Sequence, residues 1–488
     1  MLQFVRKSLL IGAALILCCG SAAGEASGKE QAIAKARELI QTDSREKWTE
    51  ALELLSPYAE DGDCRELYTR IRVGTYDFIA PFVRDAAPFM VRDGSIESWG
   101  LLAADGTVLA EPVYADINGW AQVIGNTAGF AYNRQEPDQA ALFQMVNAAF
   151  RDNDKTEDAD SGLLRMKRTP SLWNDGDFAA TGKISSSFLS HADWGFLNTR
   201  GEEVVPPQYT AVSDFYMGKA LVVNADREAL LINTEGEVTD TLPASEDYAY
   251  SRYLGYGLAE AGTGFQAQAR GAAGEGFRGM PAQSDHILDL EGRPVLTGIA
   301  GTTRCRGERL IITKTDENGL AVYGLTDLGG KEILPCEYAW MGFVTDGIVL
   351  CRTGEKAYAL YGTDGSPLTG PEAGSAAEFE ILGRGFLAGV REDGTLFVTD
   401  AEGTVYRQGD QAPDFRGGHS RLSAGLCFAA SEDGETYALY RIEGDRILRK
   451  TEGAYPLILV GNTSGYFPAQ TGGGVWDILD PEGESAVR

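Results

Sequence analysis

The stretch WGFLNTRGEEVVPPQYTAVSDFYMGKALVV, residues 194–223, predicts a unit of short antiparallel strands. Asn198 places a side-chain acceptor at the first position of a type I turn and Gly201 ends that turn, so the segment folds back as a hairpin. Tyr209 follows the return strand as an anchor. The expected strands cover residues 194–197, 203–206 and 220–223.

Copies of this turn recur along most of the chain. Six turns begin with Asn or Asp and reach a glycine three residues later; they begin at Asn198, Asn233, Asp289, Asp327, Asp400 and Asp480. Weaker copies end at Gly106, Gly365 and Gly444, where Ala103, Gly362 and Arg441 replace the Asx residue. From Gly201 through Gly236, Gly292, Gly330, Gly365, Gly403 and Gly444 to Gly483, the glycines lie 35 to 56 residues apart. Such a period indicates an array of structural repeats.

An aromatic residue followed by glycine opens the clearest copies of the unit, and a proline and a tyrosine end them. The opening pairs are Trp99-Gly100, Trp194-Gly195 and Tyr323-Gly324, and the clearest endings are Pro206 with Tyr209 and Pro335 with Tyr338. This pattern resembles the WG (KWG) repeat of bacterial surface and secreted proteins, over roughly residues 76–488. The resemblance implies an architecture rather than a particular chemistry.

The ends of the array suggest how it closes. It begins at residue 76 with the second half of a unit and ends with a first half, residues 475–480 and the Gly483 turn. Two such halves can be spliced into one shared unit, which is how β-propellers close their ring and remove exposed edge strands. We therefore expect an all-β, propeller-like array of about seven to nine blades of short antiparallel strands, with an open β-solenoid as the alternative.

Residues 1–24 have the pattern of a signal peptide: Arg6 and Lys7 precede an apolar run that ends in small residues. Cys18 and Cys19 leave a lipid anchor as an alternative. Because no later apolar stretch has the length of a membrane span, we expect no transmembrane segment after signal removal. We expect a secreted or cell-surface bacterial protein.

Residues 25–75 predict a small helical cap before the β domain of residues 76–488. Apolar residues repeat at helical spacing on both sides of a break at residues 42–44, and a third short helix follows residues 61–63. The pattern from Trp48 to Tyr68 resembles one tetratricopeptide-type helical pair. A single pair cannot bury its apolar face alone, so we expect it to lean on the first β unit. An independent peptide-binding module is the alternative.

Charge and cysteine content exclude several classes of protein. The chain has a formal net charge of −28, which disfavours nucleic acid as a partner. Five cysteines follow residue 24, without a Cys-x-x-Cys pair: Cys64, Cys305, Cys336, Cys351 and Cys427. This spacing argues against a zinc site and a disulfide framework and favours buried thiols, although Cys336 and Cys351 are near enough in one unit for one disulfide.

Motifs that would carry chemistry are weak. An insertion at about residues 125–190 contains the acidic run 152–160, which we interpret as a solvated loop, with weak calcium binding as the alternative. Residues 274–279 spell G-x-G-x-x-G without the strand and helix that hold a pyrophosphate. His191, His286 and His419 lie at different phases of the repeat. We therefore expect no catalytic residue, cofactor or metal, with paired carboxylates of a glycan-active hydrolase as the alternative.

Tryptophans outside the repeat phase are the candidate ligand contacts. Trp99, Trp194, Tyr323, Tyr358 and Tyr437 share one phase, which indicates packing between units. Trp120, Trp173 and Trp340 lie off this phase and could contact a ligand. We therefore expect an exported, non-catalytic binding or scaffold module for a protein or a glycan at the cell exterior. A glycan-active hydrolase and an envelope structural protein are the alternatives.

Overall fold

A computed structural model describes residues 22–93, 96–118, 120, 163–168, 193–245, 247–262, 284–300, 303–354, 357–369, 378–390, 396–408, 415, 418–461 and 463–487. The described chain begins with helices α2 (Ala22–Leu39), α3 (Arg45–Leu55) and α4 (Gly62–Gly74), with a short 3-10 turn, Ser56–Tyr58, after α3. Only strands follow as named elements in the described part from Phe78 onward. This order matches the predicted helical cap followed by an all-β array.

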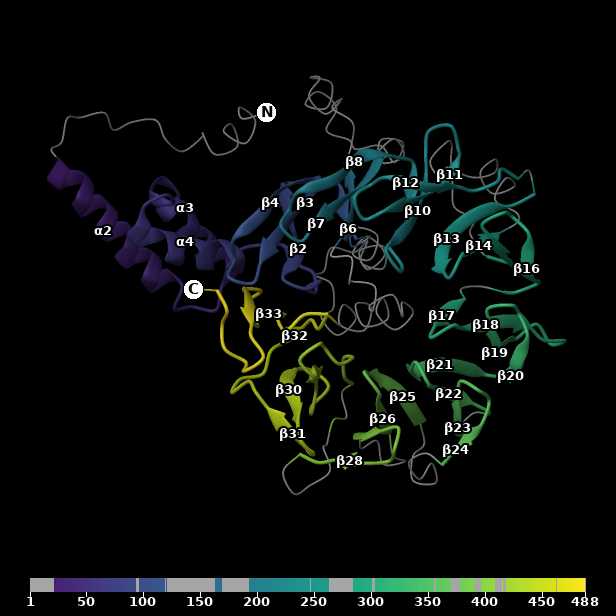
Figure 1. Ribbon diagram of the computed structural model, residues 1–488. Coiled ribbons are helices and arrows are strands. Elements are labelled where there is room, and N and C mark those ends of the chain that lie inside the picture. Colours follow the sequence, from purple (N-terminus) through teal and green to yellow (C-terminus); the bar gives the residue numbers. More distant parts are fainter. Residues whose placement is uncertain are drawn as a thin grey trace.

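The strands form nine small antiparallel sheets arranged around a ring (Figure 1), so within the described residues the fold is a β-propeller. We number its blades in chain order. Blade 1 is β1 (Phe78–Ile79), β2 (Ala86–Asp93), β3 (Ile96–Ala103) and β4 (Val108–Tyr114); blade 2 is β5 (Asp116–Ile117), β6 (Leu163–Arg168), β7 (Asp193–Asn198) and β8 (Glu203–Tyr209); blade 3 is β9 (Ala211–Val212), β10 (Lys219–Val223), β11 (Ala229–Asn233) and β12 (Val238–Thr241).

The remaining blades follow the same plan. Blade 4 is β13 (Ala249–Gly255), β14 (Leu258–Gly262), β15 (His286–Asp289) and β16 (Pro294–Thr297), and blade 5 is β17 (Arg304–Arg306), β18 (Arg309–Thr315), β19 (Ala321–Asp327) and β20 (Glu332–Tyr338). Blade 6 is β21 (Trp340–Thr345), β22 (Ile348–Arg352), β23 (Tyr358–Gly362) and β24 (Pro367–Leu368), and blade 7 is β25 (Glu378–Gly383), β26 (Phe386–Val390), β27 (Leu396–Asp400) and β28 (Val405–Tyr406). The last two have three named strands each: blade 8 is β29 (Cys427–Ala430), β30 (Ala438–Glu443) and β31 (Arg446–Arg449), and blade 9 is β32 (Leu457–Ile458), β33 (Phe467–Gln470) and β34 (Trp476–Leu479).

The repeat read from the sequence is shifted by half a blade from the structural unit. Trp194 of β7 pairs directly with Tyr209 of β8, and Tyr323 of β19 pairs with Tyr338 of β20, so these aromatic pairs join the third and fourth strands of one blade. The apolar strand that follows, β10, belongs to the next blade. Proline is tolerated in the fourth strand because that strand is the outer edge of its sheet.

The predicted Asx turns close the hairpins between third and fourth strands. In the first of them, Asn198 Oδ1 accepts hydrogen bonds from the backbone N–H groups of Arg200 and Glu202, at 2.9 and 3.0 Å. Gly201 has a φ of +80°, which is the left-handed conformation that glycine adopts without strain. Gly444 differs, because it lies in a two-residue turn between Glu443 and Arg446.

The closing glycines also form the joints between blades. A Cβ atom on Gly201 of blade 2 would lie 2.2 Å from the carbonyl oxygen of Leu109 in blade 1. A Cβ atom on Gly330 of blade 5 would lie 3.0 Å from a methyl group of Leu296 in blade 4. The turn of each of these blades therefore packs closely against the outer strand of the blade before it, and the hydrophobic clusters lie between neighbouring blades.

The structure corrects the expected splicing of the chain ends into one shared unit. β1 pairs with β2 inside blade 1, and β34 pairs with β33 inside blade 9, so the first and last blades are separate sheets. Ser485 forms a bridge with Leu479 that supplies the fourth strand position of blade 9. Because the sequence unit is half a blade out of phase, its apparent half-units at the ends are the first half of blade 1 and the second half of blade 9, and no splice is needed.

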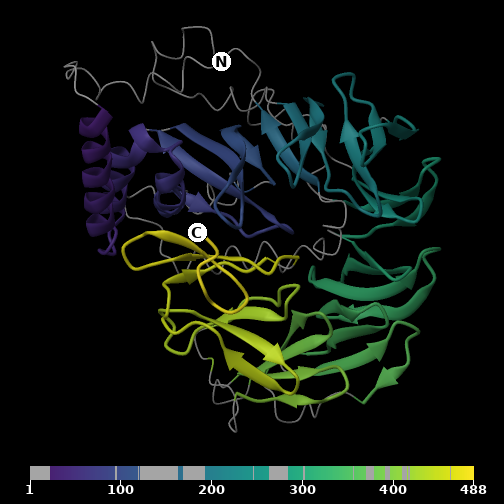
Figure 2. The ribbon, with the colours of Figure 1, turned by 60° about the vertical axis from the view of Figure 1, so that its left-hand side comes forward.

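The helices lie beside the place where blades 1 and 9 meet (Figures 1 and 2). Trp48 and Leu55 of α3 form a cluster with Ile71 of α4 and with Val475 of the last blade. These apolar side chains are thus buried mainly among the helices, with Val475 as the contact from the propeller in this cluster, and the likeness to a tetratricopeptide pair stays a prediction. In the described chain, no helix combines the length and the apolar character that a membrane span needs.

Most of the predicted insertion at 125–190 lies outside the described residues. Its described part is β6, which pairs with β5 on one side and β7 on the other. Residues 163–168 are therefore a regular strand of blade 2.

Candidate binding surface

Trp340 is a half-buried residue at the start of β21, the first strand of blade 6. The guanidinium carbon of Arg304, from the first strand of blade 5, lies 5.9 Å from the centre of the indole ring. Arg304 also donates a hydrogen bond of 3.3 Å to the carbonyl oxygen of Met341. A Cβ atom on Gly342 would lie 2.5 Å from the indole, so glycine is required for the ring to lie along its own strand. These contacts hold Trp340 in a fixed orientation.

The other two tryptophan candidates do not join Trp340. Trp120 is 6 % exposed and belongs to the large cluster around blades 1 and 9, with its ring centre 6.3 Å from that of Phe78. Trp173 lies outside the described residues. Trp340 instead packs against the cluster between blades 6 and 7. Trp120 and Trp340 therefore do not form one common aromatic surface.

The aromatic residues at the common repeat phase lie in or against the clusters between blades. Trp99 and Tyr437 are buried in the first cluster, and Trp194, Tyr323 and Tyr358 pack against three others. The glycine after the aromatic residue gives room to neighbouring strands: a Cβ atom on Gly100 would lie 2.6 Å from the ring of Phe89. These aromatic residues therefore fill the spaces between blades.

An exposed apolar surface, which sequence reasoning missed, lies on the turns between first and second strands. Met217 of blade 3 is 51 % exposed and Tyr256 of blade 4 is 39 % exposed. Their turns touch, because a Cβ atom on Gly255 would lie 2.6 Å from Met217 Sδ and 2.7 Å from the ring of Tyr216. The hydroxyl of Tyr216 donates a hydrogen bond of 2.8 Å to the carbonyl oxygen of Cys305 in blade 5. We call Tyr216, Met217 and Tyr256 the turn patch.

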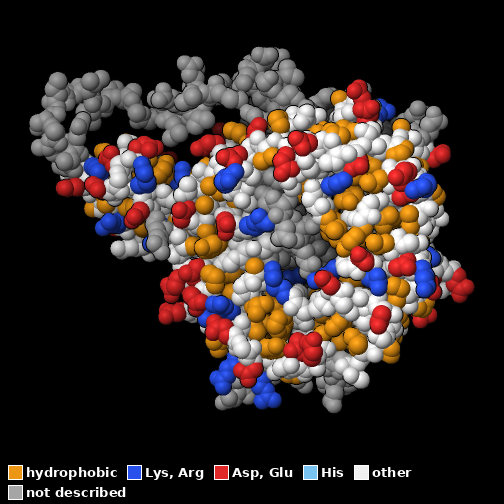
Figure 3. Space-filling model, viewed as in Figure 1, with side chains coloured by type: hydrophobic (Ala, Val, Ile, Leu, Met, Phe, Trp, Pro, Cys, Tyr) orange, Lys and Arg blue, Asp and Glu red, His pale blue; other side chains and the backbone are white. Residues whose placement is uncertain are grey.

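Met217 and Tyr256 of the turn patch have a backbone conformation that residues with large side chains rarely adopt. Met217 has a φ of 48° and Tyr256 a φ of 53°, a left-handed conformation that is rare for large residues. Glycine follows each of them, as in the two-residue turns that join antiparallel strands. The sequence signal was therefore an aromatic residue or methionine before glycine in the turn that precedes an apolar strand. Figure 3 shows hydrophobic side chains gathered around β13 and β14.

The cations next to the turn patch are paired with carboxylates. Lys219 Nζ lies 2.7 Å from Asp240 Oδ2, and its hydrogen bond lowers the pKa of Asp240. Arg306 Nε lies 2.7 Å from Asp346 Oδ1. Each carboxylate neutralises the positive charge of its partner. Lys219 and Arg306 therefore add no net positive charge beside the turn patch.

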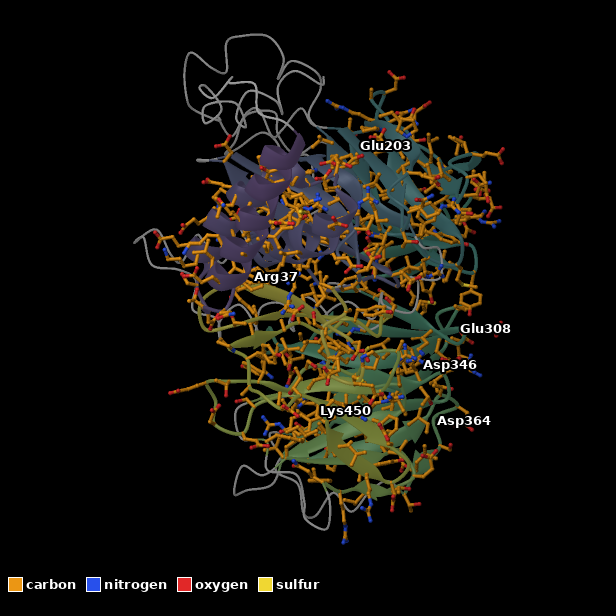
Figure 4. All side chains as sticks on the ribbon, turned by 90° about the vertical axis from the view of Figure 1, so that its left-hand side faces the viewer. Arg37, Glu203, Glu308, Asp346, Asp364 and Lys450 are labelled. Atoms are coloured by element: carbon orange, nitrogen blue, oxygen red, sulfur yellow. The ribbon has the colours of Figure 1, made fainter. Side chains whose placement is uncertain are left out.

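Carboxylates are frequent on the turns around the same side of the ring. Figure 4 shows Glu308, Asp346 and Asp364, from turns of blades 5 and 6, along one edge of the propeller. The Asx turns, which lie at the same end of the blades as the turn patch, add exposed glutamates at Glu235, Glu291, Glu402 and Glu482. The end of the blades that carries the turn patch therefore also carries many carboxylates, of which Asp346, Glu291 and Glu482 are paired with arginine or lysine side chains.

The described residues contain no group of three or more His, Cys, Asp or Glu side chains that could hold a metal ion. The hydroxyl of Ser420 donates to the carbonyl oxygen of Arg421 and accepts from the N–H of Ala429, so backbone groups hold this serine beside His419. His191, the acidic run 152–160 and the glycine-rich segment 274–279 lie outside the described residues.

The cysteines of the described residues are free thiols, which corrects the disulfide considered for Cys336 and Cys351. Cys351 is fully buried, and burial raises the pKa of its thiol to about 12. Cys427 is also fully buried, and burial raises its pKa to about 11. Both behave as small apolar core residues.

A buried ion pair within blade 4 contacts the backbone of Thr303 at the start of blade 5. Glu260 is 2 % exposed and accepts a hydrogen bond of 2.7 Å from Arg252 Nε and one of 2.5 Å from the N–H of Thr303. Arg252 also donates to the carbonyl oxygen of Thr303. Because each charge has several partners, this pair fixes the joint between the blades.

Comparison with known proteins identifies part of the repeat. No curated protein matches the chain. Among solved structures, a eukaryotic initiation factor has 13% sequence identity and a TM-score of 0.33 over 59% of this chain and 79% of its own. Hsv2 of Kluyvelomyces marxianus has 10% identity and a TM-score of 0.32 over 62% of this chain and 97% of its own. The WD40 β-propeller domain of Doa1 has 11% identity and a TM-score of 0.25 over 56% of this chain and 96% of its own.

At these scores the likenesses are distant, and the assignment of the fold rests on the sheet order and blade packing described above. One family model, described as WG containing repeat, matches residues 194–226. That segment covers the last two strands of blade 2 and the first two of blade 3. Residues 194–226 are therefore a WG-containing repeat within a β-propeller.

Proposed function

We propose that this chain is an exported, non-catalytic binding module that acts at the cell exterior and holds a protein partner on its turn patch. A propeller is a rigid scaffold whose turns can carry recognition residues. The signal-like sequence of residues 1–24 supports export. The observation that carries the proposal is the turn patch, because it exposes large apolar side chains that the fold does not bury.

Burial of Met217 and Tyr256 does not explain their presence, since both side chains are more than a third exposed. Large apolar residues at left-handed positions also cost conformational free energy, of about 1–3 kcal/mol each. Asparagine or glycine would make the same turns with less strain. A partner that buries the side chains of Met217 and Tyr256 on binding offsets this conformational free energy, which gives a reason for their presence in these turns.

The charge around the turn patch indicates the chemistry of the partner. Glu308, Asp346 and Asp364 lie on turns of blades 5 and 6 at the same end of the blades as the turn patch, and the chain as a whole carries a formal net charge of −28. An acidic partner would be repelled, whereas basic groups around an apolar anchor would be attracted. We therefore propose a protein segment that presents apolar side chains flanked by lysine or arginine.

Peptide-array binding by the mature protein tests this proposal. The double variant Met217→Asn/Tyr256→Asn removes the apolar side chains but keeps residues that tolerate left-handed backbone. We expect it to fold normally and to lose at least tenfold in affinity for basic apolar peptides, because buried apolar anchors carry most binding energy. Leu320→Asn is the control, since Leu320 is 64 % exposed in a turn between second and third strands, at the other end of blade 5.

Equal binding by the double variant and the parent protein would reject the turn patch as the contact surface. Export is tested separately by fractionation of cells that produce the full chain and a version without residues 1–24. Retention of the full chain in the cytoplasm would reject the proposed location without bearing on the turn patch.

A glycan is the second candidate ligand, and Trp340 favours it. A half-exposed indole held by Arg304 can stack on a sugar ring beside a hydrogen-bond donor. Trp340→Leu keeps apolar volume and removes the stacking surface. We expect this variant to lose glycan-array signals if sugars bind there, and unchanged signals would exclude Trp340 from the site.

An enzyme and an envelope structural protein remain distinct alternatives. A glycan-active hydrolase needs two carboxyl groups that flank the scissile bond, and turnover of a glycan by the purified protein would establish it. A structural role predicts that the protein stays with the envelope fraction and gives no signal on either array.

A further inference from the structure

The joint between blade 9 and blade 1 lacks a feature that the other joints have. Consecutive blades are connected by the chain itself, and between blades 1 and 2, 2 and 3, and 5 and 6 a single residue separates the strands of the two blades. Thr210 alone connects β8 to β9, and its N–H donates a hydrogen bond of 2.8 Å to the carbonyl oxygen of Val223. Ala339 makes the equivalent connection between β20 and β21. Blades 9 and 1 are last and first in the chain, so no such connection joins them.

One end of this seam is closed by direct contacts between the two blades. At the turns between first and second strands, the N–H of Arg84 donates a hydrogen bond of 3.2 Å to Thr463 Oγ1. Nearby, a Cβ atom on Gly461 would lie 2.3 Å from the carbonyl oxygen of Phe82. A Cβ atom on Gly106, the closing glycine of blade 1, would lie 2.8 Å from Thr69 and Val73 of α4 and 3.1 Å from Val487 of blade 9.

At the opposite end of the seam, the loop between α2 and α3 contacts both blades. On the side of blade 9, Asp43 Oδ2 accepts a hydrogen bond of 2.9 Å from the N–H of Gly473, and Thr471 Oγ1 donates to Asp43 Oδ1. The N–H of Arg45 donates to the carbonyl oxygen of Gly473, at 3.2 Å. These contacts hold the turn between β33 and β34.

On the side of blade 1, the same loop uses the side chain of Arg45. Its Nη2 donates to the carbonyl oxygen of Thr75 at 2.8 Å and to Asp77 Oδ1 at 2.7 Å. Asp77 Oδ2 in turn accepts a hydrogen bond of 2.6 Å from the N–H of Arg92 in β2. Arg45 therefore links the two blades. Its backbone N–H binds the β33–β34 turn of blade 9, and its side chain binds residues 75 and 77 beside blade 1.

We propose that residues 42–45 are a latch that closes the propeller, in place of the peptide connection that this one joint lacks. The helices hold the latch in position, because Trp48 packs against Gly74, whose Cβ would come within 2.3 Å of the indole, and α3 and α4 enclose Val475. Figure 2 shows the helices beside the blades that the latch joins. The helical segment therefore serves ring closure.

The test is amide hydrogen exchange of the full chain, followed peptide by peptide. Asp43→Ala/Arg45→Ala removes the side-chain contacts of the latch, and Lys47→Ala/Glu50→Ala removes a solvent-facing ion pair from α3 as the control. We expect exchange to rise about tenfold or more at residues 77–92 and 471–475 in the first variant and to stay unchanged in blade 5. The control variant leaves both regions unchanged.

A steric variant tests the latch without altering any charge. A Cβ atom on Gly473 would lie 1.9 Å from the carbonyl oxygen of Asp43, so Gly473→Ala pushes the loop away. Gly453→Ala is its control, because nothing lies within 4 Å of that added atom. Faster exchange confined to the seam in Gly473→Ala supports the latch even if the double variant does not fold. Exchange that rises equally in all blades, or not at all, overturns the proposal.

Discussion

The joints between blades make a quantitative prediction for Gly201→Ala. Gly201 closes an Asx turn with a φ of +80°, and an added Cβ would meet the Leu109 carbonyl oxygen at 2.2 Å. Gly319 closes an Asx turn of the same kind, also with a φ of +80°, but nothing lies within 4 Å of its added Cβ. The two substitutions therefore share the backbone strain and differ in the contact with a neighbouring blade.

The shared cost is the left-handed conformation of alanine, about 1–2 kcal/mol, which is partly offset because alanine also restricts the unfolded chain. Gly319→Ala should therefore destabilise the protein by about 1 kcal/mol. Gly201→Ala adds an overpacking cost of about 1–3 kcal/mol, because the backbone of Leu109 cannot move without separating blades 1 and 2. We expect a total of about 2–4 kcal/mol.

Chemical denaturation of the two variants and the parent protein measures the difference, and amide exchange in blades 1 and 2 shows where it arises. Gly201→Ala should speed exchange at this joint, whereas Gly319→Ala should act only near its own turn. Equal destabilisation by the two variants would refute the argument that closing glycines are needed for blade packing.

Two further predictions concern titratable groups. Burial raises the pKa of Asp477 above 3.8, so its ionisation lowers stability as the pH rises through the folded pKa. Asp477→Asn keeps an oxygen that accepts hydrogen bonds from Ser485 and Ile478, and we expect a higher melting temperature than the parent at about pH 7 but not at about pH 3. A loss of stability at both pH values would contradict this account. Burial raises the pKa of Cys351 to about 12 and that of Cys427 to about 11. An alkylating reagent should therefore label these two thiols only after the protein unfolds. Rapid labelling of the native protein would show that the thiols are accessible.

Local features of the fold could be predicted because their signals are local. The Asx turn at Asn198 needs only an acceptor side chain and a glycine three residues later, and the structure confirms it. The pairing of Trp194 with Tyr209 depends on the turn between them. The phase of the blades was not visible, because a periodic sequence does not say which of its strands share a sheet. For this reason the expected splice at the chain ends was wrong.

The candidate contacts needed information that one repeat unit does not contain. Met217 and Tyr256 lie in different blades, and only the packing of Gly255 against Met217 shows that they form one surface. Trp120 and Trp340 have the same kind of sequence position, yet one is buried beside Phe78 and the other is half exposed beside Arg304. Exposure of an aromatic side chain depends on neighbours from other units, which spacing alone does not reveal.

The Asx turns between third and fourth strands and the turns between first and second strands lie at the same end of the blades, but different constraints act on their sequences. This difference indicates which turns can determine binding specificity. At this end of the blades, closing glycines such as Gly201 and Gly330 lie inside joints, so their chemistry is fixed by blade packing. The turns between first and second strands carry Arg84, Met217, Tyr256, Glu308 and Arg384 at left-handed positions, and their chemistry differs from blade to blade. Packing does not require such variety, since glycine or asparagine would satisfy each turn. Recognition can therefore change through these turns while the ring stays intact.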